Sequence, residues 1–323
     1  MVRRSRIEQF DEAVEALLTS ATQLAPPQGE MGSLISLASE LRDLPRSDFK
    51  AKLRAELEKK LMSTTTIAGA SPIRKGFNTI TPYLQVREAT GLIDFITRAF
   101  GGQETFRGGP GSEGGMHCEM RVGESMLMIG GGPAWRGTPK PTAIHLYVSN
   151  VDDVYNRALQ AGATVLNPMT EQSYGDREGC VKDPFGNHWY IATNRETGGA
   201  PQGLRTVTVS LHSRGADNVI GFLKGAFAAD EVFRAASPEG VIHHAQIRIG
   251  DSIIEIGEAH GQYQPMPTAI FLYVADAAAT YRSSLQAGAT SLWEPAEMYD
   301  DLMGGIRDPF GNEWYIATHR VNP

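Results

Sequence analysis

The chain contains a long internal repeat, which limits its possible folds more than any other feature. Residues 183–193 (DPFGNHWYIAT) and 308–318 (DPFGNEWYIAT) are identical at ten of eleven positions. Two further matching pairs are 159–164 with 285–290 and 141–148 with 267–274. A repeat of this length predicts two copies of one supersecondary unit rather than two unrelated domains.

The repeat sets the expected domain organisation. We predict a first module at residues 76–196 and a second at 203–321. Before them, apolar residues recur every three or four positions within residues 1–62, which predicts a helical extension. Residues 63–75 have the small, polar composition of a linker. Length alone suggests about two domains for 323 residues, and the repeat makes those two domains copies of each other.

Hydrophobic periodicity predicts the same order of elements twice within each module. A strand, an amphipathic helix and three short strands form one βαβββ unit. In the first module the first unit is expected at 80–86, 91–100, 105–107, 116–122 and 125–130. The second unit is expected at 143–148, 151–161, 164–166, 178–182 and 187–193.

Three motifs in this pattern are similar to those of a known family. The Asp-Pro-Phe-Gly-Asn turn, the Ala-Gly-Ala after a helix and the segment 117–125 (HCEMRVGES) resemble the vicinal oxygen chelate superfamily, which includes glyoxalases, bleomycin resistance proteins and dioxygenases. The resemblance implies an α+β fold in which paired βαβββ units form curved mixed sheets around a cup. Here that arrangement is expected in tandem, with helices on the outer face of each sheet.

Alternation along the strands separates the side chains that face the cup from those that face the helices. Cys118, Met120 and Val122 are expected on the helix side. We predict that one cup in the first module binds a small amphipathic or aromatic ligand, because aromatic walls provide stacking area and His or Glu groups orient a polar ligand atom. The predicted contacts are Tyr83, Gln85, His117, Glu119, His145, Tyr147, His188 and Tyr190.

The resemblance also bears on metal binding, because metal-dependent members of this family use four His/Glu-type ligands from four strands. Counting from family landmarks places these positions at Thr81, Leu127, Ala143 and Tyr190, and in the second module at Thr208, Ile254, Ala269 and Tyr315. These side chains do not hold a divalent ion in the family manner. We therefore predict no metal ligands and no cofactor, and we assign no catalytic residue.

Two loop features have narrower expected roles. The Asp183 and Asp308 carboxylates are predicted to bond backbone amides of their Pro-Phe-Gly-Asn turns. Residues 174–177 match a family loop at the rim of the cup, where a loop is able to gate access.

Two alternative functions remain open. The first is a metal-dependent glyoxalase or lyase-type enzyme with a displaced site, in which His145 and Glu119 act as ligands or as an acid/base pair. The second is a regulatory protein whose N-terminal helices, within residues 1–62, dock a protein partner.

Composition narrows the expected partners and location. The formal charge of −7 does not favour binding to nucleic acid or to an anionic membrane. No apolar stretch approaches the ~18 residues of a membrane span. The only cysteines, Cys118 and Cys180, fit a reducing compartment. We expect a cytoplasmic protein that binds a small molecule.

Overall fold

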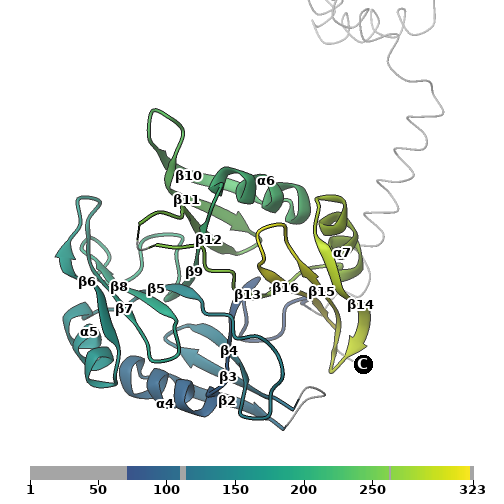
Figure 1. Cartoon of the computed structure of the whole chain (residues 1–323), viewed down its shortest axis with the longest axis horizontal. Helices are drawn as coiled ribbons and strands as arrows, with labels where there is room; N and C mark the ends of the chain where they lie inside the picture. The colour runs from purple at the N-terminus through teal and green to yellow at the C-terminus, as the bar shows by residue number, and fades with distance from the viewer. Residues whose placement is uncertain (1–70, 110–113, 262, 321–323) are drawn as a thin grey trace, which may run out of the picture. The chain divides into compact units, whose positions relative to one another are not determined.

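The computed structural model describes residues 71–109, 114–261 and 263–320 (Figure 1). The predicted helical extension at 1–62 and most of the predicted linker at 63–75 lie outside the described residues. Within the described part of the chain, no helix is long and apolar enough to cross a membrane.

The described chain repeats the βαβββ order four times, as the periodicity predicts. The first module contains β1 (Ile80–Val86), α4 (Ala89–Phe100), β2 (Gln103–Gly108), β3 (Met116–Val122), β4 (Ser125–Gly131), β5 (Ala143–Tyr147), α5 (Val151–Gln160), β6 (Thr164–Glu171), β7 (Asp176–Lys182) and β8 (His188–Asn194). The second contains β9 (Val207–Ser213), α6 (Ala216–Phe227), β10 (Asp230–Ala236), β11 (Ile242–Ile249), β12 (Ser252–Glu258), β13 (Ala269–Tyr273), α7 (Ala277–Gln286), β14 (Thr290–Met298), β15 (Asp301–Arg307) and β16 (Glu313–His319).

Local chemistry explains where several helices begin and end. The Asn150 side chain accepts a hydrogen bond from the Asp153 amide at the start of α5, and Asp276 does the same for the Ala279 amide at the start of α7. Such side-chain caps satisfy amides that have no partner within the helix. Helix α4 ends at Gly101, whose φ of 68° is left-handed and suits glycine.

Each sheet combines half of one module with half of the other. One eight-stranded sheet has the order β14-β15-β16-β13-β1-β4-β3-β2, and the second has the order β10-β11-β12-β9-β5-β8-β7-β6. The halves join through antiparallel pairing of β1 with β13 and of β5 with β9. The two modules therefore do not form separate sheets.

The hydrophobic cores, by contrast, follow the modules. One core consists of first-module residues apart from Val207, and the other consists of second-module residues apart from Ile80. Helix α4 contacts α5 (Figure 1), and α6 contacts α7. Each module thus buries the helix-covered faces of its two halves together. Within their own four-stranded units, β1 and β5 are edge strands. Each pairs with a strand of the other module, β1 with β13 and β5 with β9.

The repeated Asp-Pro-Phe-Gly turns have the predicted structure in both copies. Asp183 Oδ1 accepts hydrogen bonds from the amides of Phe185 and Asn187, each at 2.9 Å. Its Oδ2 accepts from the Asn187 side-chain amide at 2.8 Å and from the Trp189 indole at 3.0 Å. Asp308 repeats all four contacts at the same distances in the second module. The prediction that these carboxylates bond turn amides is confirmed.

Candidate functional site

The face of each sheet opposite its helices carries most of the polar and aromatic side chains predicted for the site. We call these faces cup A, on the sheet that contains β1, and cup B, on the sheet that contains β5. Phe271 in cup A and His145 in cup B are each 8% exposed, although they lie on the sheet faces opposite the described helices. The sheets therefore curve around these side chains. Cys118, Met120 and Val122 lie in the helix-side core, as alternation predicts.

The structure corrects the prediction that one cup in the first module holds all eight candidate residues. Because the sheets combine halves of both modules, these residues divide equally between the two cups. The four in cup A are Tyr83, Gln85, His117 and Glu119, and the four in cup B are His145, Tyr147, His188 and Tyr190. The single-cup prediction is wrong because alternation determines which face a side chain occupies but not which strands lie beside it.

The centre of cup B is His145, held between two carboxylates. His145 Nδ1 lies 2.9 Å from Glu255 Oε2, and its Nε2 lies 3.2 Å from Glu178 Oε2. The first contact is a hydrogen bond, whereas the second lacks hydrogen-bonding geometry. The imidazole also stacks on the Tyr147 ring, with centroids 4.2 Å apart. Glu255 comes from the second module, so the site needs both copies.

Electrostatics favour a charged imidazole at this position. Burial by itself lowers the pKa of His145, but the carboxylates of Glu255 and Glu178 outweigh this and raise the pKa to about 10. Burial raises the pKa of Glu255, but His145 outweighs that effect and lowers it. Both shifts favour an imidazolium beside an ionised Glu255.

Aromatic and neutral imidazole rings form the walls of cup B. The Tyr147 hydroxyl donates to Asp176 at 2.9 Å, and the Tyr190 hydroxyl lies 3.3 Å from His212 Nε2. Burial lowers the pKa of His188 and of His212 to about 4, so both are neutral near pH 7. Cup B therefore contains charged and neutral imidazoles side by side.

The predicted rim loop lies at cup B. Tyr174, in the turn between β6 and β7, is 63% exposed, and its hydroxyl lies 3.4 Å from Glu178 Oε2. Burial of the hydroxyl and the nearby Glu178 charge raise the pKa of Tyr174. This contact connects the rim directly to the carboxylate beside His145.

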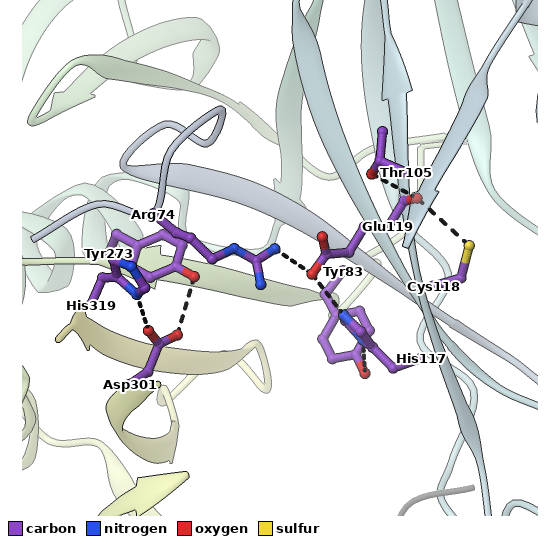
Figure 2. A network of polar contacts seen from close by, with 9 residues as sticks. All are labelled: Arg74, Tyr83, Thr105, His117, Cys118, Glu119, Tyr273, Asp301 and His319. Carbon is purple, nitrogen blue, oxygen red and sulfur yellow. Dashed lines mark hydrogen bonds and ion pairs between the residues drawn. The ribbon is translucent and has the colours of Figure 1, made fainter. Parts of the chain in front are cut away.

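Cup A contains a different polar network (Figure 2). Glu119 forms an ion pair with Arg74 and lies 3.4 Å from His117 Nε2, and His117 Nδ1 lies 3.3 Å from the Tyr83 hydroxyl. Burial raises the pKa of Glu119, but hydrogen bonds from His117 and Arg74 outweigh this and lower it. Arg74 belongs to the segment predicted as a linker, and the sequence analysis did not identify it as a site residue.

A second group in cup A surrounds Tyr315. Gln85 donates to the Tyr315 hydroxyl at 2.6 Å, and that hydroxyl donates to Glu313 Oε2 at 3.2 Å. Glu313 also pairs with Lys140 at 3.3 Å and with Arg307 at 2.9 Å. The Gln85 side chain thus bonds to a tyrosine of the second module, whereas its backbone carbonyl accepts from the Lys140 amide of the first module.

Two of the eight positions expected from the family landmarks for metal ligands lie on the helix-covered faces of the sheets and not in a cup. Leu127 and Ile254 lie in the helix-side cores, so those counts stop one residue short of a cup-facing position. The next residues are Met128, which lies in the apolar cluster of cup A, and Glu255 in cup B. Glu255 is the only charged residue in the stretch Ile-Ile-Glu-Ile at 253–256. Strand alternation from its apolar neighbours would have indicated that Glu255 faces the cup.

One group in cup B has the chemistry to hold a metal ion, although it does not occupy the counted family positions. Within the described residues, ligand atoms of His145, Asp176 and Glu178 lie within 4.8 Å of one another. Asp176 already accepts hydrogen bonds from Tyr147 and from Asn194. Glu178 was not predicted, although alternation from Val181, which lies in the helix-side core, places Glu178 on the opposite face of the same strand.

A small cavity lies outside both groups of residues. It has a volume of about 20 Å³, room for roughly one water molecule. Its lining includes Ile80 and Pro82 on β1 and Val207 and Val209 on β9, where the two sheets meet. We assign it no ligand, because the charged and aromatic groups of the cups do not line it.

Comparison with known families and proteins gives consistent results. Residues 76–191 match the family described as Glyoxalase/Bleomycin resistance protein/Dioxygenase superfamily. An uncharacterised protein of Mycobacterium bovis is 39% identical over 123 residues, which cover 35% of this chain and 80% of that protein. A related protein of Mycobacterium tuberculosis is also 39% identical over 123 residues, covering 35% of this chain and 72% of its own length.

Solved structures with a similar fold come from plants and bacteria. Glyoxalase I from Zea mays has a TM-score of 0.56 at 14% identity, covering 74% of this chain and 92% of its own. A putative dioxygenase from Bacillus subtilis has a TM-score of 0.52 at 13% identity, covering 75% of this chain and 85% of its own. At these identities the similarity concerns the fold.

Proposed function

The chain belongs to the glyoxalase/bleomycin resistance protein/dioxygenase superfamily, and from this premise we propose that it binds a small amphipathic or aromatic molecule in cup B without the family metal. One observation carries the proposal. Two buried imidazole nitrogens in cup B, His188 Nδ1 and His212 Nδ1, have no hydrogen-bond partner among the described residues, and His145 Nε2 has only its ion-pair contact with Glu178. Buried polar atoms are normally paired, so His188 Nδ1 and His212 Nδ1 call for a partner that the described residues do not supply.

The surroundings of these nitrogens suit a ligand with two kinds of surface. Tyr190, His212 and Tyr263 form a cluster of rings, with Tyr190 and His212 centroids 5.7 Å apart and His212 and Tyr263 centroids 5.6 Å apart. Such rings stack against an aromatic or apolar body. The neutral imidazoles and the carboxylates of Glu178 and Glu255 then orient polar atoms of the ligand.

Equilibrium binding of 8-anilinonaphthalene-1-sulfonate, an aromatic amphipathic probe, tests the proposal on the full chain. We expect saturable binding, and His212→Ala should weaken it by about tenfold through the loss of one hydrogen bond and one ring. Gln85→Ala is the matched control, because Gln85 occupies the same position in cup A. Non-saturable binding, or equal losses in both variants, would contradict a site in cup B.

A second candidate function is a metal-dependent enzyme of the glyoxalase or lyase type, favoured by the close approach of His145, Asp176 and Glu178 ligand atoms. Imidazole and carboxylate donors suit divalent first-row ions, which polarise carbonyl oxygens or activate water when bound. Glu255 would orient His145 through Nδ1, leaving Nε2 for the ion. The originally expected pair of His145 and Glu119 does not fit this candidate, since the two lie in different cups.

Metal analysis of the purified chain distinguishes the two candidates. The leading proposal predicts well under one equivalent of Zn²⁺, Ni²⁺ or Fe²⁺. One tightly held equivalent that Glu178→Gln reduces about tenfold or more would support the metal-dependent enzyme instead. We also propose a cytoplasmic location, which is supported by the buried free thiols of Cys118 and Cys180.

A further inference from the structure

The segment at residues 71–78, which we call the strap, joins the two halves of the sheet at cup A. The Arg74 side chain forms an ion pair with Glu119 on β3, from the first module. The His319 amide on β16, from the second module, donates to the Pro72 carbonyl at 2.9 Å. Ile73 and Phe77 pack against the apolar cluster that includes Met128, Phe271 and Tyr315. The strap therefore contributes one charged and two apolar side chains to cup A.

The Arg74 guanidinium lies in surroundings that recognise such a group well (Figure 2). Its carbon lies 4.1 Å from the centre of the Phe77 ring, and its nitrogen pairs with Glu119, which is 5% exposed. On its other side Tyr273 and Asp301 act on it electrostatically, although burial opposes the charge. A buried carboxylate and an aromatic face are the usual partners of a guanidinium.

The two charged residues Arg74 and Glu119 are present together in cup A, and both are replaced at the corresponding positions of the repeat. Through the offset of 127 residues that relates β1 to β9, Arg74 corresponds to Pro201. By the same offset, Glu119 corresponds to Gln246. Cup B thus lacks both the cation and the carboxylate at these positions. The pair belongs to cup A specifically and is not a general requirement of the fold.

The way the strap is attached allows Arg74 to leave without disturbing β1. Asn78 Nδ2 and the Thr79 amide are held by Asp251 at 3.0 Å and 2.8 Å, so the chain is fixed where the strand begins. Just before that point Gly76 has a φ of 90° with open space around it, and it provides a turn between the anchored strand and the strap. Arg74 is the cation paired with the buried Glu119 carboxylate, and without it the ion-pair contact of Glu119 that remains within the described residues is the one with His117. A buried carboxylate in that situation favours a replacement cation.

We propose that cup A is a binding site for a guanidinium or primary ammonium group carried by a small molecule, and that Arg74 is an intramolecular occupant which such a ligand must displace. The site is separate from the one proposed in cup B. It explains why the cation paired with the buried Glu119 carboxylate comes from the strap, in addition to the contact with His117 of the sheet. The cationic group of such a ligand would take the place of the Arg74 guanidinium over the Phe77 ring and beside Glu119.

Calorimetric titration with agmatine, a guanidinium on a short aliphatic chain, tests this on the full-length protein. We expect Arg74→Ala to bind agmatine about tenfold or more tightly than the wild type, because the competing occupant is gone. The double variant Arg74→Ala/Glu119→Gln should lose this binding. Agmatine should also raise the melting temperature of Arg74→Ala but not that of the double variant.

Two results would overturn the inference. One is the absence of saturable agmatine binding to a folded Arg74→Ala variant, and the other is equal binding by the double variant. If Arg74→Ala does not fold, Arg74→Gln keeps much of the side-chain stem and the same comparison applies. The His212→Ala variant separates the two sites, since it should leave agmatine binding unchanged whether or not cup B binds its own ligand.

Discussion

Cup A and cup B have the same strand arrangement but place opposite chemistry at equivalent positions. His145 and Glu255 form a buried ion pair in cup B, whereas Phe271 and Met128 occupy these positions in cup A and belong to an apolar cluster. Elsewhere the relation reverses, since Glu119 in cup A corresponds to Gln246 in cup B. The two cups are therefore two different sites on one scaffold.

The repeated turns and the tryptophans bonded to them do not share this divergence. Trp189 and Trp314 are both fully buried in the cores, and their indole N–H groups donate to Asp183 and Asp308 at the same distance of 3.0 Å. Core positions must fill a fixed volume and turn positions must satisfy fixed amides, so a change there costs stability. Side chains on the helix-free face have fewer such requirements, which leaves them available for different ligands.

The largest expected effect on stability comes from replacing His145 in cup B by the phenylalanine that occupies the same position in cup A. His145→Phe keeps the ring volume but leaves Glu255 buried without its cation, so we expect a loss of about 3–5 kcal/mol in the free energy of unfolding. Urea denaturation measures this loss. The double variant His145→Phe/Glu255→Met should recover most of it, because an apolar pair replaces an ion pair at little net cost. A double variant as unstable as the single one would show that the two cups differ in backbone and not only in side chains.

The next largest effect on stability is expected in the Asp-Pro-Phe-Gly turns, which have the same structure in both modules. Asp183→Ala and Asp308→Ala each remove the acceptor of four hydrogen bonds with the same geometry. We expect each to lower the free energy of unfolding by about 2–3 kcal/mol, since buried donors lose their partner. Thermal unfolding of both variants in parallel gives the comparison. A large difference between them would mean that the matching turns support cores of unequal stability.

A smaller effect is expected from the strap. Arg74→Ala removes the ion pair to Glu119, but the Arg74 side chain is 35% exposed, so solvent screens the interaction. We expect a loss of about 1–2 kcal/mol in urea denaturation. The control is Arg205→Ala, near the start of β9, whose exposed pair with Asp251 should contribute less than about 1 kcal/mol. If Arg74→Ala and Arg205→Ala lowered the free energy of unfolding equally, the pair of Arg74 with Glu119 would contribute no more than an exposed surface ion pair.

The smallest effect concerns pH and separates the charged pair of His145 and Glu255 in cup B from the apolar pair that occupies the same positions in cup A. The folded pKa of His145, about 10, lies above its ordinary value of about 6.5. The stability that the imidazolium contributes is therefore complete below pH 6.5 and is lost as pH rises through 10. Relative to His145→Phe/Glu255→Met, the wild type should lose up to about 1 kcal/mol of unfolding free energy between pH 7 and 8. A difference that stays constant or grows with pH would contradict a charged His145.

Much of the local structure was predictable from residue patterns. The bounds of β1 and β3 match the predicted strands, and alternation correctly placed Cys118 on the helix side. The candidate site was predicted less completely, since Arg74, Glu178 and Glu255 were missed. Arg74 lies in a stretch with linker composition, where neither helical nor strand periodicity applies. Its role depends on a carboxylate 45 residues away in the chain.

The sequence by itself determined the repeat, the order of the strands and helices, the face that each strand residue occupies and the chemistry of the Asp-Pro-Phe-Gly turns. These follow from short-range periodicity and from contacts within a few residues. Only the tertiary structure decided that β1 pairs with β13 and β5 with β9, and hence that His145 meets Glu255, 110 residues away. The physical reason is that each module buries its helix-covered faces in its own core. Its free strand edges must then pair with the other module, so each cup is built from both.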